Sequence, residues 1–375
     1  MKRLLICEKP SVAETLALAL QTGRDITRSI YKGVRYFRIS DGNDEVIICS
    51  ASGHLFELFS KGAKGRRQYP VWDHLWLPRK DRTVSRQIEL IAMEAAKADE
   101  IYDACDFDPE GSLVAYMVLR EACQGRDRIA RRMQFSTLSR HELARAFEHA
   151  KAQLDYRLIE AGLCRHEVDW TYGVNLSRAI TELALLDRVK YRNLTIGRVQ
   201  GPTLDLIIER EKEILQFTPE PYWKIQATGL FGNSKIPLQY EKSHIASIEE
   251  AHTIVSECSR KEGIIARIDV ATVRKAPPPP FNLLDLQLEC YRLYGIRPYD
   301  TLRIAEQLYL EGRISYPRTS SQQLPPPDRL PSHTDASTIY PRIRKGLQVD
   351  SRPRESKSTK RISVRPSSSR NIPDR

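Results

Sequence analysis

Short apolar runs and helix-like repeats alternate along the first part of the chain. Four runs have the length and apolar content of strands, namely 3–7, 36–40, 45–50 and 101–105. Two stretches have apolar residues at helical spacing, namely 10–20 and 84–98. This order of strands and helices predicts an α/β domain over residues 1–147.

The pattern changes along the rest of the chain. Residues 148–216 are predicted to be helical, and residues 217–276 combine three strand-like runs with a helix. A stiff proline linker then introduces two helices within residues 277–325. The last segment, 326–375, is rich in Pro, Ser and Arg without sustained periodicity, so we expect a disordered tail. The sequence therefore predicts a multidomain protein.

Composition limits the class of protein. Hydrophobic residues make up 41% of the chain and charged residues 29%, which is ordinary for a folded, water-soluble protein. No apolar run approaches the roughly 18 residues of a membrane span. The apolar N-terminal run is too short for a signal peptide, so we expect a cytoplasmic protein without membrane contact. The seven cysteines form no CxxC pair, so neither a zinc ribbon nor a disulfide framework is indicated.

The net charge of +11 favours a polyanionic partner. Residues 351–375 hold eight basic and two acidic residues, a net of +6. The rest of the chain is therefore only mildly basic, and its charge is a weaker indication than the total suggests.

The clearest chemical pattern is an acidic stretch between the apolar run 101–105 and a helical run that begins at Ser112. Asp106, Asp108 and Glu110 alternate there, so in an extended or turning backbone their carboxylates project to one side. Three crowded acids repel one another unless a cation neutralises them, and hard oxygen ligands in this number suit Mg²⁺. The alternative is a solvated acidic loop before a helix, where the helix dipole favours acids.

Two other predicted strands end in polar residues. Glu8 and Lys9 follow the first strand, and His54 follows the run 45–50. Because ligands of open parallel sheets bind beyond the carboxyl ends of the strands, we expect these residues to meet the acidic stretch. Each also has a structural interpretation: Glu8 as a helix-start acid, Lys9 as a solvated side chain and His54 as an incidental histidine.

Three later stretches suit phosphate or nucleic acid. Aromatic and basic side chains interleave along 165–178, although a charged helix face has the same composition. Arg198 lies in a glycine-containing loop before a helix, where backbone N–H groups and a guanidinium can hold a phosphate. Tyr316 precedes a proline, which favours extended backbone and places Arg318 on the same side, where it can stabilise a phenolate nucleophile. The alternative is a packed tyrosine beside an exposed arginine.

Together these stretches resemble the type IA DNA topoisomerases, in register from Leu4 to about Pro325. The motifs that carry the resemblance are Glu8-Lys9-Pro10-Ser11, Ser52-Gly53-His54-Leu55, Asp106-Phe107-Asp108-Pro109-Glu110-Gly111, Glu167-Val168-Asp169-Trp170, Asn175-Leu176-Ser177-Arg178, Gly197-Arg198-Val199-Gln200 and Tyr316-Pro317-Arg318-Thr319-Ser320-Ser321. Their order and spacing together are specific. The first motif is more similar to archaeal members and to the bacterial topoisomerase III branch than to bacterial topoisomerase I.

The resemblance implies a fold and a reaction. The four segments up to residue 325 would be a Toprim domain, a helical DNA-binding domain, a partial β arch domain and the start of a helical nucleophile domain. The reaction would break and rejoin single-stranded or underwound DNA without ATP, through a 5′-phosphotyrosine, and so relax supercoils or decatenate rings. We also expect a monomer.

The resemblance assigns roles to individual residues. Tyr316 would be the nucleophile and Arg318 would steady the scissile phosphate, while Glu8, supported by Lys9, would transfer a proton at the leaving oxygen. The implied Mg²⁺ ligands are Glu8, Asp106, Asp108 and Glu110. The implied DNA contacts are His54, Arg132, Arg165, Asp169, Asn175, Arg178, Arg198, Gln200 and Thr319.

Two departures from the family pattern bear on activity. Ser320-Ser321 stands where the family usually has Asp-Ser, which we expect to affect local hydrogen bonding only. The rest of the nucleophile domain, including a histidine-containing motif, is not recognisable in 326–375. We therefore expect an amino-terminal fragment made by a frameshift or a truncated reading frame. Genomic DNA without a topoisomerase-like continuation in any frame would refute this hypothesis.

Two alternative functions are compatible with the sequence. A catalytically inactive fragment that binds single-stranded nucleic acid would keep the Toprim and helical surfaces but would form no covalent tyrosyl-DNA adduct. Another Toprim enzyme, such as a primase or a nuclease, would share the acidic site, but the stretch 316–319 argues against it.

Overall fold

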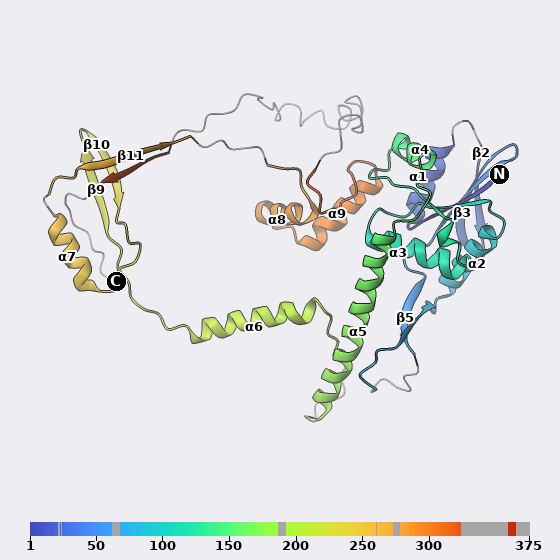
Figure 1. The fold of residues 1–375 in the computed structure, drawn as a ribbon, viewed down its shortest axis with the longest axis horizontal. Helices are drawn as coiled ribbons and strands as arrows, with labels where there is room; N and C mark the ends of the chain where they lie inside the picture. Colours follow the sequence, from blue (N-terminus) through green and yellow to red (C-terminus); the bar gives the residue numbers. More distant parts are fainter. Residues whose placement is uncertain are drawn as a thin grey trace. The chain divides into compact units, whose positions relative to one another are not determined.

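The structure is a computed structural model that describes residues 1–21, 23, 25–61, 68–186, 193–259, 261–272, 278–323 and 359–364. The chain divides into two compact units (Figure 1). The first unit consists of residues 1–206 and 279–330, and the second of residues 207–278 and 331–375. The division into five segments that the sequence suggests is finer than this and stays a prediction.

A six-stranded sheet forms the centre of the first unit (Figure 1). Its strands, in spatial order, are β2 (Asp25–Tyr31), β3 (Val34–Asp41), β4 (Asp44–Ser50), β1 (Lys2–Cys7), β7 (Glu100–Asp103) and β8 (Arg131–Arg132). β4, β1, β7 and β8 run parallel, whereas β2 and β3 form an antiparallel edge. The carboxyl ends of β4, β1 and β7 therefore meet at one edge of the sheet, as the sequence predicted.

Helices cover both faces of this sheet (Figure 1). They are α1 (Pro10–Leu20), α2 (Arg82–Ala95), α3 (Pro109–Met117) and α4 (Arg140–Glu148). Leu4 and Ile6 of β1 belong to the core under α2 and α3. Leu5 and Cys7 belong to the core under α1 and α4. All four side chains are fully buried, which explains why this strand is an uninterrupted apolar run in the sequence.

The first unit also holds a hairpin, two short helical turns and three longer helices. These elements are β5 (Phe56–Ser60), β6 (His74–Pro78), a π-helical turn (Val118–Ala122), a 3-10 turn (Arg126–Arg128), α5 (Tyr156–Leu186), α8 (Leu283–Tyr294) and α9 (Pro298–Leu310). The helix α6 (Gln200–Gln216) begins in the first unit and ends in the second. Among the described residues, none of the helices combines the length and hydrophobicity that a bilayer span needs.

Two glycines allow the start of α3 to pack closely against its neighbours. A Cβ atom on Gly111 would lie 2.4 Å from the backbone oxygen of Asp106. A Cβ atom on Gly162, in α5, would lie 2.6 Å from the backbone oxygen of Pro109. Gly111 therefore lets the acidic loop fold over the helix start, and Gly162 lets α5 approach the same turn.

The described part of the second unit contains a helix and two pairs of strands, besides the end of α6. Its elements are β9 (Gln226–Phe231), β10 (Ser234–Gln239), α7 (Ile248–Cys258), β11 (Ile265–Ala271) and β12 (Thr359–Val364). β10 pairs with β9 and β12 pairs with β11, both antiparallel.

The strand β12 lies within the segment 326–375, for which the sequence predicts a disordered tail. Of this segment the structure describes residues 359–364, which pair with β11. Three of these six residues are β-branched, which suits a strand, but the Pro- and Ser-rich sequence around them obscured this pattern. The other residues of the predicted tail lie outside the described part of the chain.

The close packing at Gly162 predicts a destabilising effect of Gly162→Ala. We expect a loss of about 1–3 kcal/mol in the free energy of unfolding, because the added methyl group forces α5 away from Pro109. Denaturant unfolding followed by circular dichroism measures this loss. Gly173→Ala in the same helix is the matched control, since a Cβ atom there would meet its nearest neighbour at 3.6 Å. Equal losses in the two variants would contradict the packing account.

Candidate active site

A buried ion pair holds the backbone of the acidic loop. Arg132 of β8 and Asp103 of β7 approach to 2.8 Å (Nη1 to Oδ1), and their side chains are 0% and 1% exposed. Arg132 also donates hydrogen bonds to the backbone oxygens of Cys105 and Asp106, at 2.8 and 3.0 Å. One guanidinium therefore binds three groups at the end of β7 and the start of the loop.

The DNA contact that the resemblance implied for Arg132 stays a prediction. In this structure its guanidinium is fully buried. The physical reason is the carboxylate of Asp103, which is buried with it and needs a compensating cation. Burial raises the pKa of Asp103 to about 6, although Arg132 opposes the shift. Arg132 is a positioning residue for the acidic loop.

Asp106 lies beside the residues that follow β1. Lys9 Nζ donates a hydrogen bond to Asp106 at 2.8 Å, and the hydroxyl of Tyr309, from α9, donates to the same carboxylate at 3.4 Å. Burial lowers the pKa of Lys9, but the charge and hydrogen bond of Asp106 outweigh burial, so the pKa is raised. Burial raises the pKa of Glu8, and the charges of Asp106 and Asp108 raise it further. The structure thus brings Glu8 and Lys9 to the acidic loop.

Asp108 joins the acidic loop to the tyrosine segment. Its side chain caps α3 by accepting a hydrogen bond from the backbone N–H of Gly111 at 2.7 Å. It also accepts a hydrogen bond from the hydroxyl of Tyr316 at 2.5 Å. Burial and the hydrogen bond to Asp108 raise the pKa of Tyr316 well above its usual value, while Arg318 opposes the shift. The phenol is therefore protonated in this arrangement and needs a proton acceptor before it can act as a nucleophile.

Arg318 forms an ion pair with Glu306 of α9. Its Nε and Nη2 atoms donate to the same carboxylate oxygen at 2.9 and 2.8 Å. The side chains of Arg318 and Glu306 are 46% and 29% exposed, so the pair is open to solvent. A phosphate could therefore replace the carboxylate on this guanidinium.

Glu110 has partners of its own. The Nε2 atoms of His54 and His166 lie 3.0 and 2.8 Å from the same Oε2 atom of Glu110. Arg165 Nη1 lies 3.3 Å from the other oxygen. The hydrogen bonds of His166 and then of His54 hold the pKa of Glu110 far below its usual range.

The sequence predicted a divalent cation at four acids of this site. Glu8, Asp106 and Asp108 offer the all-oxygen ligand set that Mg²⁺ prefers. Burial raises the pKa of Glu8 and the charges of Asp106 and Asp108 raise it further, and a bound cation would offset these two charges. The predicted fourth ligand, Glu110, is bound instead to two histidines, and the three ligand atoms of that group lie within 4.8 Å of one another. Among the described residues, this is the group whose ligand atoms lie close enough together for a metal ion. A cation held by Glu8, Asp106 and Asp108 stays a prediction.

Asp169 connects two of the predicted DNA-binding arginines. It lies 3.8 Å from Arg165 Nε, one turn earlier in α5, and 2.5 Å from Arg198 Nε in the loop before α6. Both arginines are exposed, with 58% and 41% of their side chains accessible. Their contact with DNA stays a prediction.

Asn175 and Arg178 attach α5 to the segment between β5 and β6. Asn175 accepts a hydrogen bond from the backbone N–H of Val71 at 2.6 Å and donates to its carbonyl at 2.9 Å. Arg178 donates to the backbone oxygen of Gln68. These contacts give both residues a structural role beside the DNA contact expected of them.

The last two predicted DNA contacts lie in other elements. Gln200 is the exposed first residue of α6. Thr319 accepts a hydrogen bond at its hydroxyl from the backbone N–H of Ser321 at 3.0 Å. The structure does not place either side chain in the group around Asp106 and Asp108.

Sequence reasoning assigned no role in the site to His166, Tyr309 or Glu306. His166 follows Arg165, for which the resemblance implied a DNA contact. Its position in the same helix could therefore have indicated a role in the site. Tyr309 and Glu306 lie in the helix before Tyr316, where periodicity shows a helix and no chemistry. Their roles depend on contacts across the fold.

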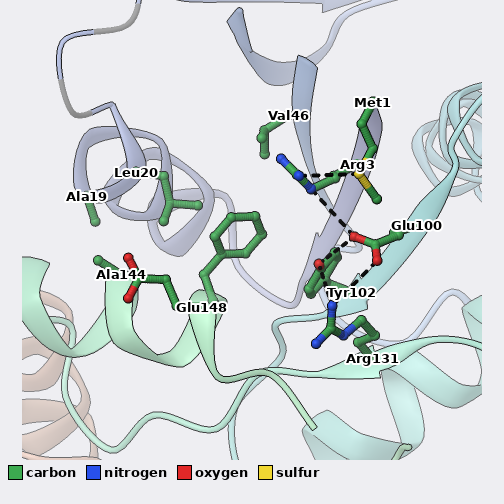
Figure 2. Close-up of a pocket in the computed structure, with 11 residues that line it drawn as sticks. Met1, Arg3, Ala19, Leu20, Val46, Glu100, Tyr102, Arg131, Ala144 and Glu148 are labelled. Atoms are coloured by element: carbon green, nitrogen blue, oxygen red, sulfur yellow. Dashed lines mark hydrogen bonds and ion pairs between the residues drawn. The ribbon is translucent and has the colours of Figure 1, made fainter. Parts of the chain in front are cut away.

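A groove at the opposite end of the sheet is a poorer candidate (Figure 2). Glu100 lies 3.5 Å from Arg3 and 3.5 Å from Arg131, and it accepts a hydrogen bond from Tyr102 at 2.7 Å. Arg3, Glu100 and Arg131 are therefore already paired with one another in this groove.

Comparison with known families and proteins gives consistent results. A family model described as DNA topoisomerase matches residues 153–365, and a Toprim domain model matches residues 3–138. The first match extends past Pro325, farther than the motifs of the sequence indicated.

Several curated relatives match most of this chain. DNA topoisomerase 1 of Pyrococcus horikoshii is 38% identical over 327 residues, covering 86% of this chain and 47% of the relative. DNA topoisomerase 1 of Methanocaldococcus jannaschii is 41% identical over 330 residues, covering 87% and 42%. DNA topoisomerase 3 of Staphylococcus haemolyticus is 30% identical over 339 residues, covering 86% and 44%. The chain thus spans less than half the length of these relatives.

A solved structure shows the same fold. Full-length topoisomerase I from Thermotoga maritima superposes with a TM-score of 0.60 and 23% identity, covering 90% of this chain and 52% of the other. At this identity the likeness concerns the fold.

The buried ion pair predicts a large effect of Arg132→Ala. Removing the cation leaves Asp103 buried and unpaired, so we expect the free energy of unfolding to fall by about 3–5 kcal/mol. Arg131→Ala, at the neighbouring position of β8, is the control. Its side chain is 36% exposed and pairs with Glu100 at 3.5 Å, so we expect a loss below about 1 kcal/mol. Denaturant unfolding of both variants measures the difference, and similar losses would refute the role of Arg132.

Proposed function

The chain belongs to the type IA DNA topoisomerase family, and we propose that it cleaves and reseals single-stranded DNA with Tyr316 as the nucleophile. The covalent intermediate is a 5′-phosphotyrosine, and no ATP is consumed. Passage of another strand before resealing would relax supercoils or decatenate rings. The proposal includes underwound or single-stranded DNA as the substrate, a monomeric protein and a cytoplasmic location.

The contact between Tyr316 and Asp108 is the observation that supports the proposal most directly. The two residues are 208 positions apart in the chain, yet the phenolic hydroxyl donates to the carboxylate at 2.5 Å. Folding therefore brings the phenol of Tyr316, the carboxylate of Asp108 and the positively charged Lys9 together at the acidic loop.

The proposed reaction is a transesterification in which atoms and charges balance. The phenolic oxygen of Tyr316 bonds to phosphorus, and the bond from phosphorus to the 3′-oxygen breaks. Asp108 accepts the phenolic proton, and Glu8 gives a proton to the leaving 3′-oxygen. The raised pKa of Glu8 favours the protonated form that this step needs. Resealing reverses both proton transfers.

Positive charge near the phosphate comes from the chain and from a metal ion. Asp106, together with whichever of Asp108 and Glu8 is ionised, would hold Mg²⁺, which would supply charge compensation for the phosphate. Lys9 adds a fixed charge next to Asp106. Arg318 reaches a phosphate when it leaves Glu306.

A cleavage assay with end-labelled single-stranded DNA and Mg²⁺ tests the proposal. We expect a protein-linked DNA band from the unaltered chain and none from Tyr316→Phe. Tyr309→Phe is the matched control, because Tyr309 is also buried beside the loop and its ring packs against Tyr316 at 5.1 Å. We expect this control to keep adduct formation within about tenfold, since it removes only a 3.4 Å hydrogen bond.

Two outcomes would contradict the assignment of the nucleophile. A covalent band that persists in Tyr316→Phe would place the nucleophile elsewhere. If DNA is retarded in the gel but no covalent band forms, the second candidate function is favoured, namely a DNA-binding fragment without catalysis. This function remains an alternative because the chain covers less than half of the relatives' length.

The ion pair of Arg318 predicts a gain in DNA affinity for Glu306→Gln. The carboxylate of Glu306 competes with phosphate for the guanidinium of Arg318. Because this ion pair is partly exposed, removing it is expected to strengthen DNA binding by at most about 1 kcal/mol, or about fivefold in affinity. Fluorescence anisotropy with single-stranded DNA measures the change. Glu311→Gln is the control, because Glu311 pairs with Arg313 and not with Arg318. A lower affinity in Glu306→Gln would contradict the competition.

A further inference from the structure

The side chains of His54, Glu110 and His166 converge outside the acid set formed by Glu8, Asp106 and Asp108. Both imidazole Nε2 atoms point at one carboxylate oxygen, at 3.0 and 2.8 Å. The two rings are 4.7 Å apart between centroids and inclined by 53°. Between 25% and 31% of each side chain is exposed, so an ion in solution can reach the group.

The helix α5 holds His166 in place through its packing on α3. Gly162 lies against the backbone oxygen of Pro109, where no side chain fits. His166 follows one helical turn later on the same face of α5, which brings its ring beside Glu110. The ring also lies 5.9 Å from that of Trp76 in the hairpin. The position of His166 thus depends on the packing of two helices and not on a flexible loop.

The loop after β4 holds His54 in place. Ser52 and Gly53 adopt positive φ angles of 52° and 95°, and serine rarely adopts this conformation. The hydroxyl of Ser52 accepts a hydrogen bond at 2.7 Å from Gln87, whose side chain is buried in α2. This contact fixes the turn that directs His54 toward Glu110.

Two imidazole nitrogens and one carboxylate oxygen are a ligand set for borderline transition metals. Mg²⁺ prefers oxygen ligands alone, whereas imidazole suits Zn²⁺, Ni²⁺ and Cu²⁺. Three protein ligands with a water at the fourth position are a common arrangement around Zn²⁺. We propose that His54, Glu110 and His166 form a binding site for a transition-metal ion of the Zn²⁺ type, separate from the oxygen-ligand site of Asp106 and Asp108.

The charges around the group are compatible with a divalent cation. Arg165 faces one oxygen of Glu110 at 3.3 Å, but its side chain is 58% exposed and its charge is therefore screened. The other oxygen faces both imidazoles and is the one available to the ion. Glu8 is close enough to His54 for their charges to interact, which adds a negative group. Binding needs a lone pair on each Nε2 atom, so the ring proton of each neutral histidine moves to Nδ1.

Titration of the full chain with Zn²⁺ alone, without DNA, tests this site. Isothermal calorimetry is expected to show one ion per chain, and Co²⁺ as a probe is expected to give the absorption of a four- or five-coordinate ion. His166→Gln and His54→Gln are each expected to weaken binding by about 100-fold or more, because even outer-shell partners contribute about 10- to 100-fold. Millimolar Mg²⁺ is not expected to displace the ion.

Two control variants separate this site from other surface ligands. Cys164→Ser removes an exposed thiol two positions from His166. His74→Gln removes a histidine that lies 3.5 Å from Glu167. Both controls are expected to keep full affinity. Circular dichroism of every variant shows whether its fold is intact.

The proposal is overturned if Zn²⁺ does not bind, if binding is unchanged in His166→Gln and His54→Gln, or if Cys164→Ser or His74→Gln abolishes it. Because the titration contains no DNA, failure of the cleavage reaction leaves its result unaffected.

Discussion

The buried pair of Arg132 and Asp103 is the constraint on which the acidic site depends. Its two charges are removed from water at the end of β7, where an unpaired charge would strongly destabilise the fold. The pair therefore holds this end of the sheet in one conformation. The same guanidinium binds the backbone oxygens of Cys105 and Asp106. The loop therefore leaves the sheet in a fixed direction, and Gly111 lets it fold back onto the start of α3.

This geometry separates three neighbouring acids into three chemical settings. Asp106 lies with Lys9, Asp108 lies with the phenol of Tyr316, and Glu110 lies with two histidines. Burial raises the pKa of Glu8, and the charges of Asp106 and Asp108 raise it further. The site thus holds a protonated phenol against a carboxylate that can take its proton. A phosphate and a cation are the two charged groups that would complete this arrangement.

The sequence predicts the framework of this site better than its contacts. Parallel strands end at one edge of a sheet, so the meeting of Glu8, Lys9 and the acidic loop followed from three apolar runs and the residues after them. The burial of Arg132 did not follow, because a basic residue in a two-residue strand looks like a surface residue. The pairing of β12 with β11 joins segments far apart in sequence, whereas the local Pro- and Ser-rich composition predicts disorder. His166 reaches Glu110 only because Gly162 allows two helices to touch, which periodicity does not encode.

Identification of the covalently modified residue and of the DNA end attached to it tests the central claim most directly. Single-stranded DNA labelled at its 3′ end or its 5′ end is incubated with the protein and Mg²⁺, the adduct is digested, and the modified peptide is identified by mass spectrometry. The account predicts that the 3′-labelled fragment stays on the protein, attached through its 5′-phosphate to Tyr316. A label on another residue, or retention of the 5′-labelled fragment, would contradict it.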